Sequence, residues 1–222
     1  MKRLIDGALR FQGEVYQEHR ALFRELATSQ QPEALLITCS DSRVAPDLIV
    51  QARPGDLFIC RNAGNIAPPY SDVNGGVTAT IEYAVAVLKV GHIIVCGHSD
   101  CGAMKALLHP EKLKGLPSVR SWLHHASRAE VVVRENHPDL DEPARITALI
   151  EENVLAQLDN LRTHPCVASR LKSGTLELHG WVYDIESGQI RVSNNQSAFM
   201  PMTQAIELEQ AIQDEQEKAI HA

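Results

Sequence analysis

The chain has 222 residues, of which 44% are hydrophobic, and its formal net charge is -7 at pH 7. This length predicts one globular unit with a sizeable buried core, so we expect a single domain over residues 1–222. A negative charge without any Lys/Arg-rich run excludes a dense phosphate-binding surface, and we expect no nucleic-acid partner.

The amino-terminal 20 residues are broken by charged side chains before any apolar core of signal-peptide length. No run of about 18 apolar residues follows, so we expect no membrane partner. The five cysteines are an odd number in a chain too large to need disulfide staples. These features together predict a cytoplasmic protein.

Residues 13–28 intersperse apolar side chains with charged ones and, with residues 4–11, predict amphipathic helices. We therefore expect residues 1–30 to form a helical arm whose apolar face requires a partner surface. This arm precedes the first strand-like run of the chain.

Short apolar runs at 35–39, 57–61 and 93–98 alternate with helical patterns. Between the last two, residues 75–90 predict a mostly buried helix. That order predicts βαβ units and therefore an α/β fold, with a mostly parallel central sheet and flanking helices.

Helical patterns follow the third strand, and the chain then returns to two strand-like runs, 175–185 and 190–194. Gly188, between these two runs, suits a tight hairpin turn, so we expect one antiparallel strand at the edge of the sheet. The polar residues 205–222 predict a carboxyl-terminal helix or tail that frays at its end.

Two chemically reactive residues, Cys39 and His98, end predicted parallel strands, where open α/β sheets collect their ligands and catalytic groups. Cys101 follows three residues later, before a predicted helix whose N-terminus favours a thiolate. Two thiolates and one imidazole suit zinc, and three protein ligands with a fourth position for water are typical of catalytic sites. On the spacing alone, a buried packing role for Cys39 stays open.

The stretch CSDSRV places Asp41 and Arg43 at alternate positions after Cys39. In an extended segment these three side chains point to the same side. A metal on Cys39 would then have a carboxylate beside it and a guanidinium behind it. The alternative is a surface ion pair of little energetic consequence.

These motifs resemble the signature of the β-class carbonic anhydrases, Cys-x-Asp-x-Arg followed much later by His-x-x-Cys. The resemblance is closest to the bacterial and plant-like branch, which includes enzymes associated with cyanate metabolism. Further similar stretches extend it over nearly the whole chain: 61–70, 75–85, 98–105 and 178–188.

The resemblance implies one Zn2+ per chain, bound by Cys39, His98 and Cys101, with Asp41 and Arg43 as a dyad beside the zinc-bound water. It also implies the activity of a carbonic anhydrase, the reversible hydration of carbon dioxide to bicarbonate and a proton. In that reaction the zinc-bound hydroxide attacks the substrate while the Asp/Arg dyad orients it.

By the same resemblance, Gln30, Phe58, Tyr83 and the backbone N–H of Gly102 form the substrate pocket. In the family part of this pocket comes from a partner subunit, so we expect a homodimer or a higher homo-oligomer. From the residues alone, core packing is the favoured interpretation of Phe58 and Tyr83, and only the resemblance places them in a pocket. Two departures are Val87, where plant relatives carry a proton-transferring histidine, and Ala63, where they carry valine.

Members of the family that are inhibited by bicarbonate bind it with a tryptophan, an arginine and a tyrosine. Arg61 and Tyr183 match the last two, but Leu36 replaces the tryptophan and cannot donate a hydrogen bond to an anion. We therefore predict a metal site that stays open, with Asp41 paired to Arg43.

Three other functions fit parts of the pattern. Relatives with the same fold hydrolyse carbonyl sulfide or carbon disulfide. A zinc-storing or structural module would have Asp41 as a fourth ligand. A cysteine-based redox protein is disfavoured because no Cys-x-x-Cys is present.

Overall fold

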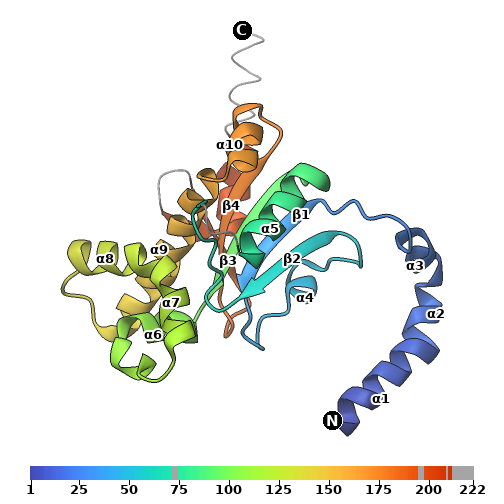
Figure 1. Cartoon of the computed structure of the whole chain (residues 1–222), viewed down its shortest axis with the longest axis horizontal. Helices are drawn as coiled ribbons and strands as arrows, with labels where there is room; N and C mark the ends of the chain where they lie inside the picture. The colour runs from blue at the N-terminus through green and yellow to red at the C-terminus, as the bar shows by residue number, and fades with distance from the viewer. Residues whose placement is uncertain (72–74, 195–197, 209, 212–222) are drawn as a thin grey trace.

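The computed structural model describes residues 1–71, 75–194, 198–208 and 210–211. Its centre is a six-stranded sheet with the order β2-β1-β3-β4-β5-β6. Helices pack beside this sheet, and an amino-terminal arm extends away from it (Figure 1). The predicted α/β fold is confirmed.

Four strands form the parallel part of the sheet: β1 (Ala34–Cys39), β2 (Leu57–Asn62), β3 (His92–His98) and β4 (Glu177–Tyr183). β1 lies between β2 and β3, and every one of its residues is buried. Such burial explains why the run ALLITC is continuously apolar up to Thr38 and does not alternate with polar residues.

The antiparallel edge is also confirmed. β5 (Ile190–Ser193) pairs with β4 through a turn in which Gly188 has φ of 73°, a left-handed conformation that glycine adopts readily. A further short strand, β6 (Phe199–Pro201), pairs antiparallel with β5 and was not predicted from the sequence. Of the expected helix at 205–222, residues 205–208 are helical, whereas 209 and 212–222 lie outside the described residues.

The long helix α9 (Glu142–Arg162) packs against β3 and β4 and supplies much of the main core. It begins after Asp141, whose carboxylate accepts a hydrogen bond from the Ala144 N–H at 3.0 Å. The other helical segments are α4 (Pro46–Val50), α5 (Gly76–Glu82), η2 (Tyr83–Val87), α6 (Gly102–Leu108), η3 (Pro110–Leu113), α7 (Pro117–Leu123), η4 (His124–Ala126), α8 (Ser127–Asn136) and α10 (Pro165–Lys172).

The helix expected at 75–90 exists, as α5 and η2, but it is not mostly buried as predicted. One side contributes Ile81, Ala84 and Val85 to the core, while Tyr83 and Val87 are 45% and 59% exposed. The prediction was wrong because apolar side chains on the outer side of this helix made its pattern look uniformly buried. In the single chain that side is uncovered.

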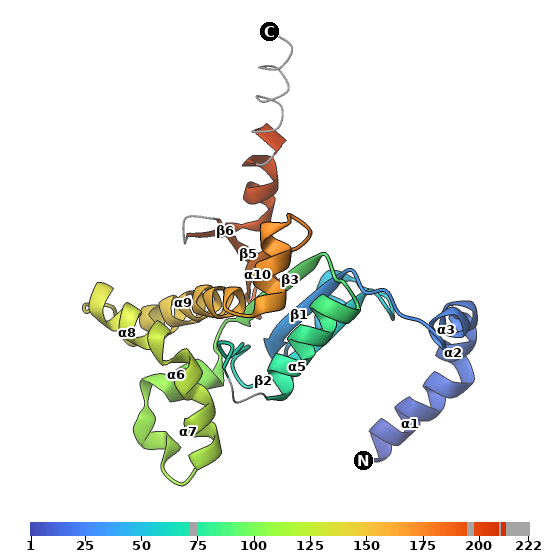
Figure 2. The ribbon, with the colours of Figure 1, turned by 45° about the horizontal axis from the view of Figure 1, so that its top comes forward.

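The arm consists of α1 (Lys2–Arg10), η1 (Phe11–Val15), α2 (Tyr16–Glu18) and α3 (Arg20–Leu26), as the amphipathic pattern predicted. It stands apart from the sheet in both views (Figures 1 and 2). From residue 1 to residue 26 no side chain is buried, and Leu4 and Leu9 are more than 60% exposed. Across the described ranges no helix is long and apolar enough to cross a membrane.

Candidate metal centre

Cys39, His98 and Cys101 meet at the carboxyl ends of the parallel strands, as their positions in the sequence predicted. Cys39 ends β1, His98 ends β3, and Cys101 precedes α6 as its N-cap residue. The two sulfur atoms and a ring nitrogen lie within 4.8 Å of one another, and all three residues are buried. Three ligand types that suit zinc therefore surround one point.

His98 is oriented for metal binding. Its Nδ1 lies 2.8 Å from the carbonyl oxygen of Ser99, which can only accept, so Nδ1 carries the ring proton. Nε2 then presents a lone pair. Within the described part of the chain this buried Nε2 has no hydrogen-bond partner, an arrangement that a polar atom rarely tolerates unless a ligand satisfies it.

The two thiols favour opposite protonation states. The pKa of Cys39 is well below its ordinary value, chiefly because the Cys101 thiol donates a hydrogen bond to its sulfur. The Gly64 N–H also donates to Cys39 Sγ, at 3.4 Å. The pKa of Cys101 is raised by this same bond and by burial. A divalent cation would remove the conflict by stabilising both thiolates, so the donor set fits zinc.

Asp41 lies beside this group, with Oδ2 3.9 Å from His98 Nε2. Arg43 donates to both of its carboxylate oxygens, from Nε at 2.9 Å and from a terminal nitrogen at 2.8 Å. These two bonds hold the pKa of Asp41 well below its usual range. A carboxylate that stays ionised can only accept hydrogen bonds.

Asp100, which the sequence reasoning did not single out, holds the other side of the guanidinium. Its Oδ2 lies 3.1 Å from Arg43, and its other oxygen pairs with Lys105 on α6. The Lys105 and Arg43 contacts lower the pKa of Asp100. Its position between His98 and Cys101, in HSDC, is the sequence signal that could have identified it.

Arg61 has a structural role that the sequence did not reveal. From β2 it donates to the carbonyl oxygens of Cys39, Asp41 and Val44 at 3.1, 2.8 and 2.9 Å. Three bonds to one loop hold in place the backbone that carries both Cys39 and Asp41.

Leu36, at which the sequence predicts no hydrogen-bond donor for an anion, is buried. It packs with Ala34, Ile94 and Cys96 on one face of the sheet, and Tyr183 is partly buried against this cluster. The surroundings of Leu36 are therefore apolar.

Three of the predicted pocket residues lie away from the metal ligands of their own chain. Phe58 pairs with Leu35 across β2 and β1, and Leu35 is four residues before Cys39, about 13 Å along a strand. The ring of Tyr83 lies 5.9 Å from that of Phe58. Gln30 precedes β1 and is exposed. Only Gly102, the first residue of α6, adjoins the ligands.

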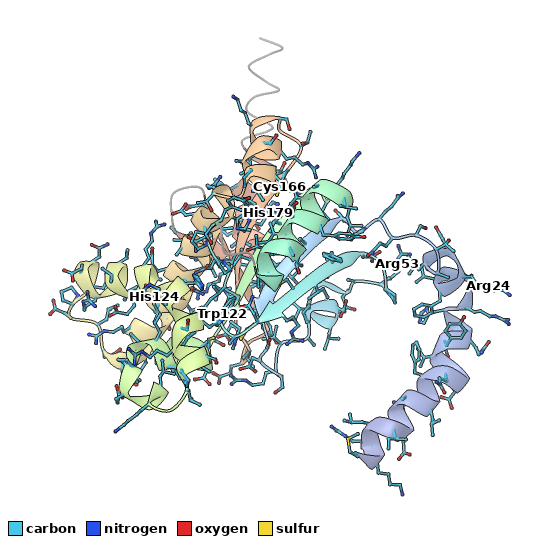
Figure 3. All side chains as sticks on the ribbon, in the orientation of Figure 1. Arg24, Arg53, Trp122, His124, Cys166 and His179 are labelled. Carbon is cyan, nitrogen blue, oxygen red and sulfur yellow. The ribbon has the colours of Figure 1, made fainter. Side chains whose placement is uncertain are left out.

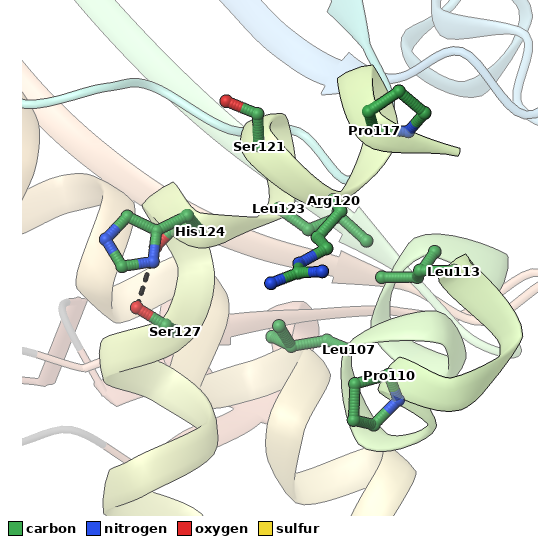
Figure 4. Close-up of a pocket in the computed structure, with 9 residues that line it drawn as sticks. All are labelled: Leu107, Pro110, Leu113, Pro117, Arg120, Ser121, Leu123, His124 and Ser127. Carbon is green, nitrogen blue, oxygen red and sulfur yellow. Dashed lines mark hydrogen bonds between the residues drawn. The ribbon is translucent and has the colours of Figure 1, made fainter. Parts of the chain in front are cut away.

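A separate pocket of about 540 Å3 opens between α6, α7 and the turns beside them (Figure 4). Its walls are largely apolar, and Ser127 Oγ donates to the carbonyl oxygen of His124 at 2.7 Å inside it. The pocket shares none of its lining residues with the metal ligands. The lining residues are Leu107, Pro110, Leu113, Pro117, Arg120, Ser121, Leu123, His124 and Ser127.

Comparisons with known proteins agree on one family. Residues 34–190 match the family model described as carbonic anhydrase. The carbonic anhydrase of Pseudomonas aeruginosa is 58% identical over 190 residues, which cover 86% of each chain.

Solved structures agree with that match. The β-carbonic anhydrase CcaA superimposes with a TM-score of 0.88 at 46% identity, covering 90% of this chain and 98% of its own. A tetrameric β-carbonic anhydrase of the ascomycete Sordaria macrospora has a TM-score of 0.78 at 33% identity, covering 86% and 95%.

Proposed function

The chain belongs to the β-class carbonic anhydrases, and we propose that it hydrates carbon dioxide reversibly with one Zn2+ held by Cys39, His98 and Cys101. The observation that carries this proposal is the buried Nε2 of His98, which has no hydrogen-bond partner among the described residues and belongs to one cluster with two thiols. When bound, zinc lowers the pKa of water from about 15.7 towards neutrality and so supplies hydroxide as nucleophile.

In this proposal Asp41 and Arg43 control the direction of attack. Arg43 keeps Asp41 ionised, so the carboxylate would accept a hydrogen bond from the attacking hydroxide and thereby direct the hydroxide lone pair at carbon dioxide. Arg43 also keeps the Asp41 carboxylate away from the metal position. With Oδ2 only 3.9 Å from His98 Nε2, a freed Asp41 could reach the metal and close the site.

We further propose that the substrate pocket is completed by a second copy of the chain. Gln30, Phe58 and Tyr83 lie at the amino-terminal side of the sheet, too far to reach the metal ligands of their own subunit. The exposed apolar face of the arm and the exposed Tyr83 favour a surface that a partner covers. Gly102 would contribute its backbone N–H from the subunit that binds the metal.

The smallest complete catalyst is then a homodimer, and a higher homo-oligomer is compatible with it. Residues 1–222 act as a single domain in this proposal, with residues 1–30 as the arm that crosses to the neighbour. The five cysteines are free, and thiolate ligands are retained best in a reducing compartment, which supports a cytoplasmic location.

The decisive experiment measures carbon dioxide hydration by stopped flow on protein of known zinc content. We expect about one catalytic zinc per chain, and Cys101→Ser should lose both this zinc and the activity because two ligands hold the ion poorly. Full zinc content with full activity in that variant would disprove the ligand assignment. Zinc-loaded wild-type protein without activity would instead favour a storage or structural role.

The two-subunit pocket is tested by mixing two inactive variants, Gln30→Ala and Arg43→Ala, after dissociation and reassembly. If the pocket is shared, one of the two sites in each mixed dimer is intact. Because about half of the dimers are mixed at equal mixing, activity should return to about a quarter of the wild-type value. If each chain supplies its own Gln30, every site keeps one lesion and mixing restores nothing.

A further inference from the structure

A second group of metal-ligating side chains lies on the sheet outside the catalytic site. His92 is the first residue of β3, and Glu177 and His179 are the first and third residues of β4. Their ligand atoms lie within 4.8 Å of one another. His92 Nδ1 is 3.1 Å from His179 Nε2, and the Glu177 carboxylate is 3.8 Å from the first and 3.7 Å from the second.

The register of the two strands builds this group. His92 pairs directly with Glu177, and Ile94 pairs with His179. Because side chains alternate across a strand, Glu177 and His179 point to one face of β4, the same face to which His92 points from β3. Neighbouring parallel strands therefore hold all three ligands without any loop.

The distances suit a metal ion. Two Zn–N bonds of 2.0–2.1 Å at a tetrahedral angle separate the nitrogens by about 3.3 Å, close to the 3.1 Å between the two histidines. Both imidazoles are about one-third exposed, so an ion could reach them, and Glu177 is exposed enough to close the remaining few tenths of an ångström. Two neutral imidazoles and one carboxylate are a common ligand set for zinc and related divalent ions.

We propose that His92, Glu177 and His179 form a second binding site for a divalent transition-metal ion of the zinc class. His92 is six residues before His98 on β3, which separates this site from the catalytic ligands by about 20 Å. The second site joins the amino ends of β3 and β4 and contains no sulfur. Its ligands are more exposed than Cys39, His98 and Cys101, so it binds its ion more weakly than the catalytic centre. Figure 3 labels His179 on β4.

Cobalt titration of the metal-free full-length protein tests the proposal independently of activity. The first equivalent should give sulfur-to-cobalt charge-transfer absorption from the two cysteines. The second equivalent should add ligand-field absorption without further charge transfer, because its ligands are nitrogen and oxygen only. Zinc should likewise bind to two equivalents per chain, measured by competition with a chelating dye.

The variants His92→Gln and His179→Gln should lose the second equivalent and keep the charge-transfer band of the first. Glu177→Gln changes an exposed side chain, so it keeps the fold and should weaken binding of the second metal equivalent. The matched control is His109→Gln, which removes a histidine that also lies beside carboxylates, Glu142 at 3.1 Å and Glu111 at 3.5 Å, but that belongs to no metal-ligating group within the described residues. It should bind two equivalents like the wild type.

Three results would overturn the proposal. The first is saturation of the wild-type protein at one metal equivalent, which would leave His92 and His179 as a simple hydrogen-bonded pair. The second is persistence of the second bound equivalent in both histidine variants. The third is an equal loss of that equivalent in His109→Gln, which would indicate adventitious binding by surface histidines. A failure here leaves the carbonic anhydrase assignment untouched, because that assignment depends on the first equivalent.

Discussion

The two ends of strand β3 each carry a histidine, and the surroundings of the two side chains differ. His98, at the carboxyl end, is fully buried between two thiols, and its ring is oriented by the Ser99 carbonyl. His92, at the amino end, is about one-third exposed and lies beside His179 and Glu177. Loops and helix α6 complete the first group, whereas strand register alone assembles the second.

This difference explains why the two groups suit different tasks. A buried site with soft thiolate ligands holds an ion tightly. An exposed site of imidazoles and a carboxylate exchanges its ion more readily. The carboxyl end also has the Asp41 carboxylate, which accepts hydrogen bonds from Arg43 on both oxygens.

The largest effect that separates the two ends is expected for His98→Ala. Loss of one of three buried ligands should release the catalytic zinc and reduce carbon dioxide hydration by several orders of magnitude, since the metal supplies the nucleophile. His109→Ala, which removes a partly exposed histidine after α6, should keep both zinc and activity. Stopped-flow rates with metal analysis check this, and a fully active His98→Ala would end the assignment of the catalytic site to this end.

Arg43→Ala should have the next largest effect. Without its partner Asp41 loses its orientation, so kcat should fall about 10²- to 10³-fold, the range seen when an oriented active-site hydrogen bond is removed, while the zinc at Cys39, His98 and Cys101 is retained. Arg134→Ala on α8, which removes an exposed arginine paired with Glu130, is the matched control. Wild-type turnover in Arg43→Ala would show that the dyad has no role in orientation.

Gly64→Ala tests how much the packing beside Cys39, at the carboxyl end of the sheet, contributes to the free energy of unfolding. Gly64 has φ of 85°, and a Cβ there would lie 3.1 Å from both Ala103 and Met104, so we expect a loss of about 1–3 kcal/mol from strain plus crowding. Gly115→Ala separates the two causes, because Gly115 has φ of 87° with nothing within 4 Å of the added Cβ. Urea unfolding should show the larger loss for Gly64→Ala, and equal losses would mean that packing around Gly64 is unimportant.

The smallest effect is expected for the inhibition of activity by bicarbonate. Arg61 already donates three hydrogen bonds to the loop between Cys39 and Val44, and Leu36 offers no donor, so a regulatory anion has little to bind. Activity should rise smoothly with pH and show ordinary product inhibition. Steeply cooperative inhibition in initial-rate measurements would mean that the carboxyl end closes on Asp41 after all.

Much of the fold was predictable because hydrophobic runs and turn residues are local signals. The three parallel strands up to His98 and the Gly188 hairpin follow from such signals. The short strand β6 was missed because three residues carry too little pattern. The exposure of Tyr83 and Val87 was missed because composition cannot tell an apolar side chain buried in the core from one on the outer side of the same helix.

The catalytic group was predictable for a related reason. The ends of parallel strands come together whatever the length of the connections, so Cys39 and His98 were expected to meet. Arg61 and Asp100 could not be assigned in this way. Their roles depend on which backbone oxygens and which side of the guanidinium they reach, and those distances arise only after the loops have packed.

The sequence by itself determined the class of fold and the ligand types at the ends of β1 and β3. The extended segment expected to place Cys39, Asp41 and Arg43 on one side was wrong, because β1 ends at Cys39 and a turn follows, closed by the Val44 N–H and the Asp41 carbonyl oxygen. The tertiary structure alone decided that His98 Nε2 has no hydrogen-bond partner among the described residues, that Arg61 bonds to the backbone around Cys39, and that His92 faces His179 across two strands. The physical reason is the distance along the sequence over which each property is set. Hydrophobic runs and strand ends are local properties of the chain, whereas register, burial and hydrogen-bond partners depend on residues far apart in the sequence, 87 positions for His92 and His179.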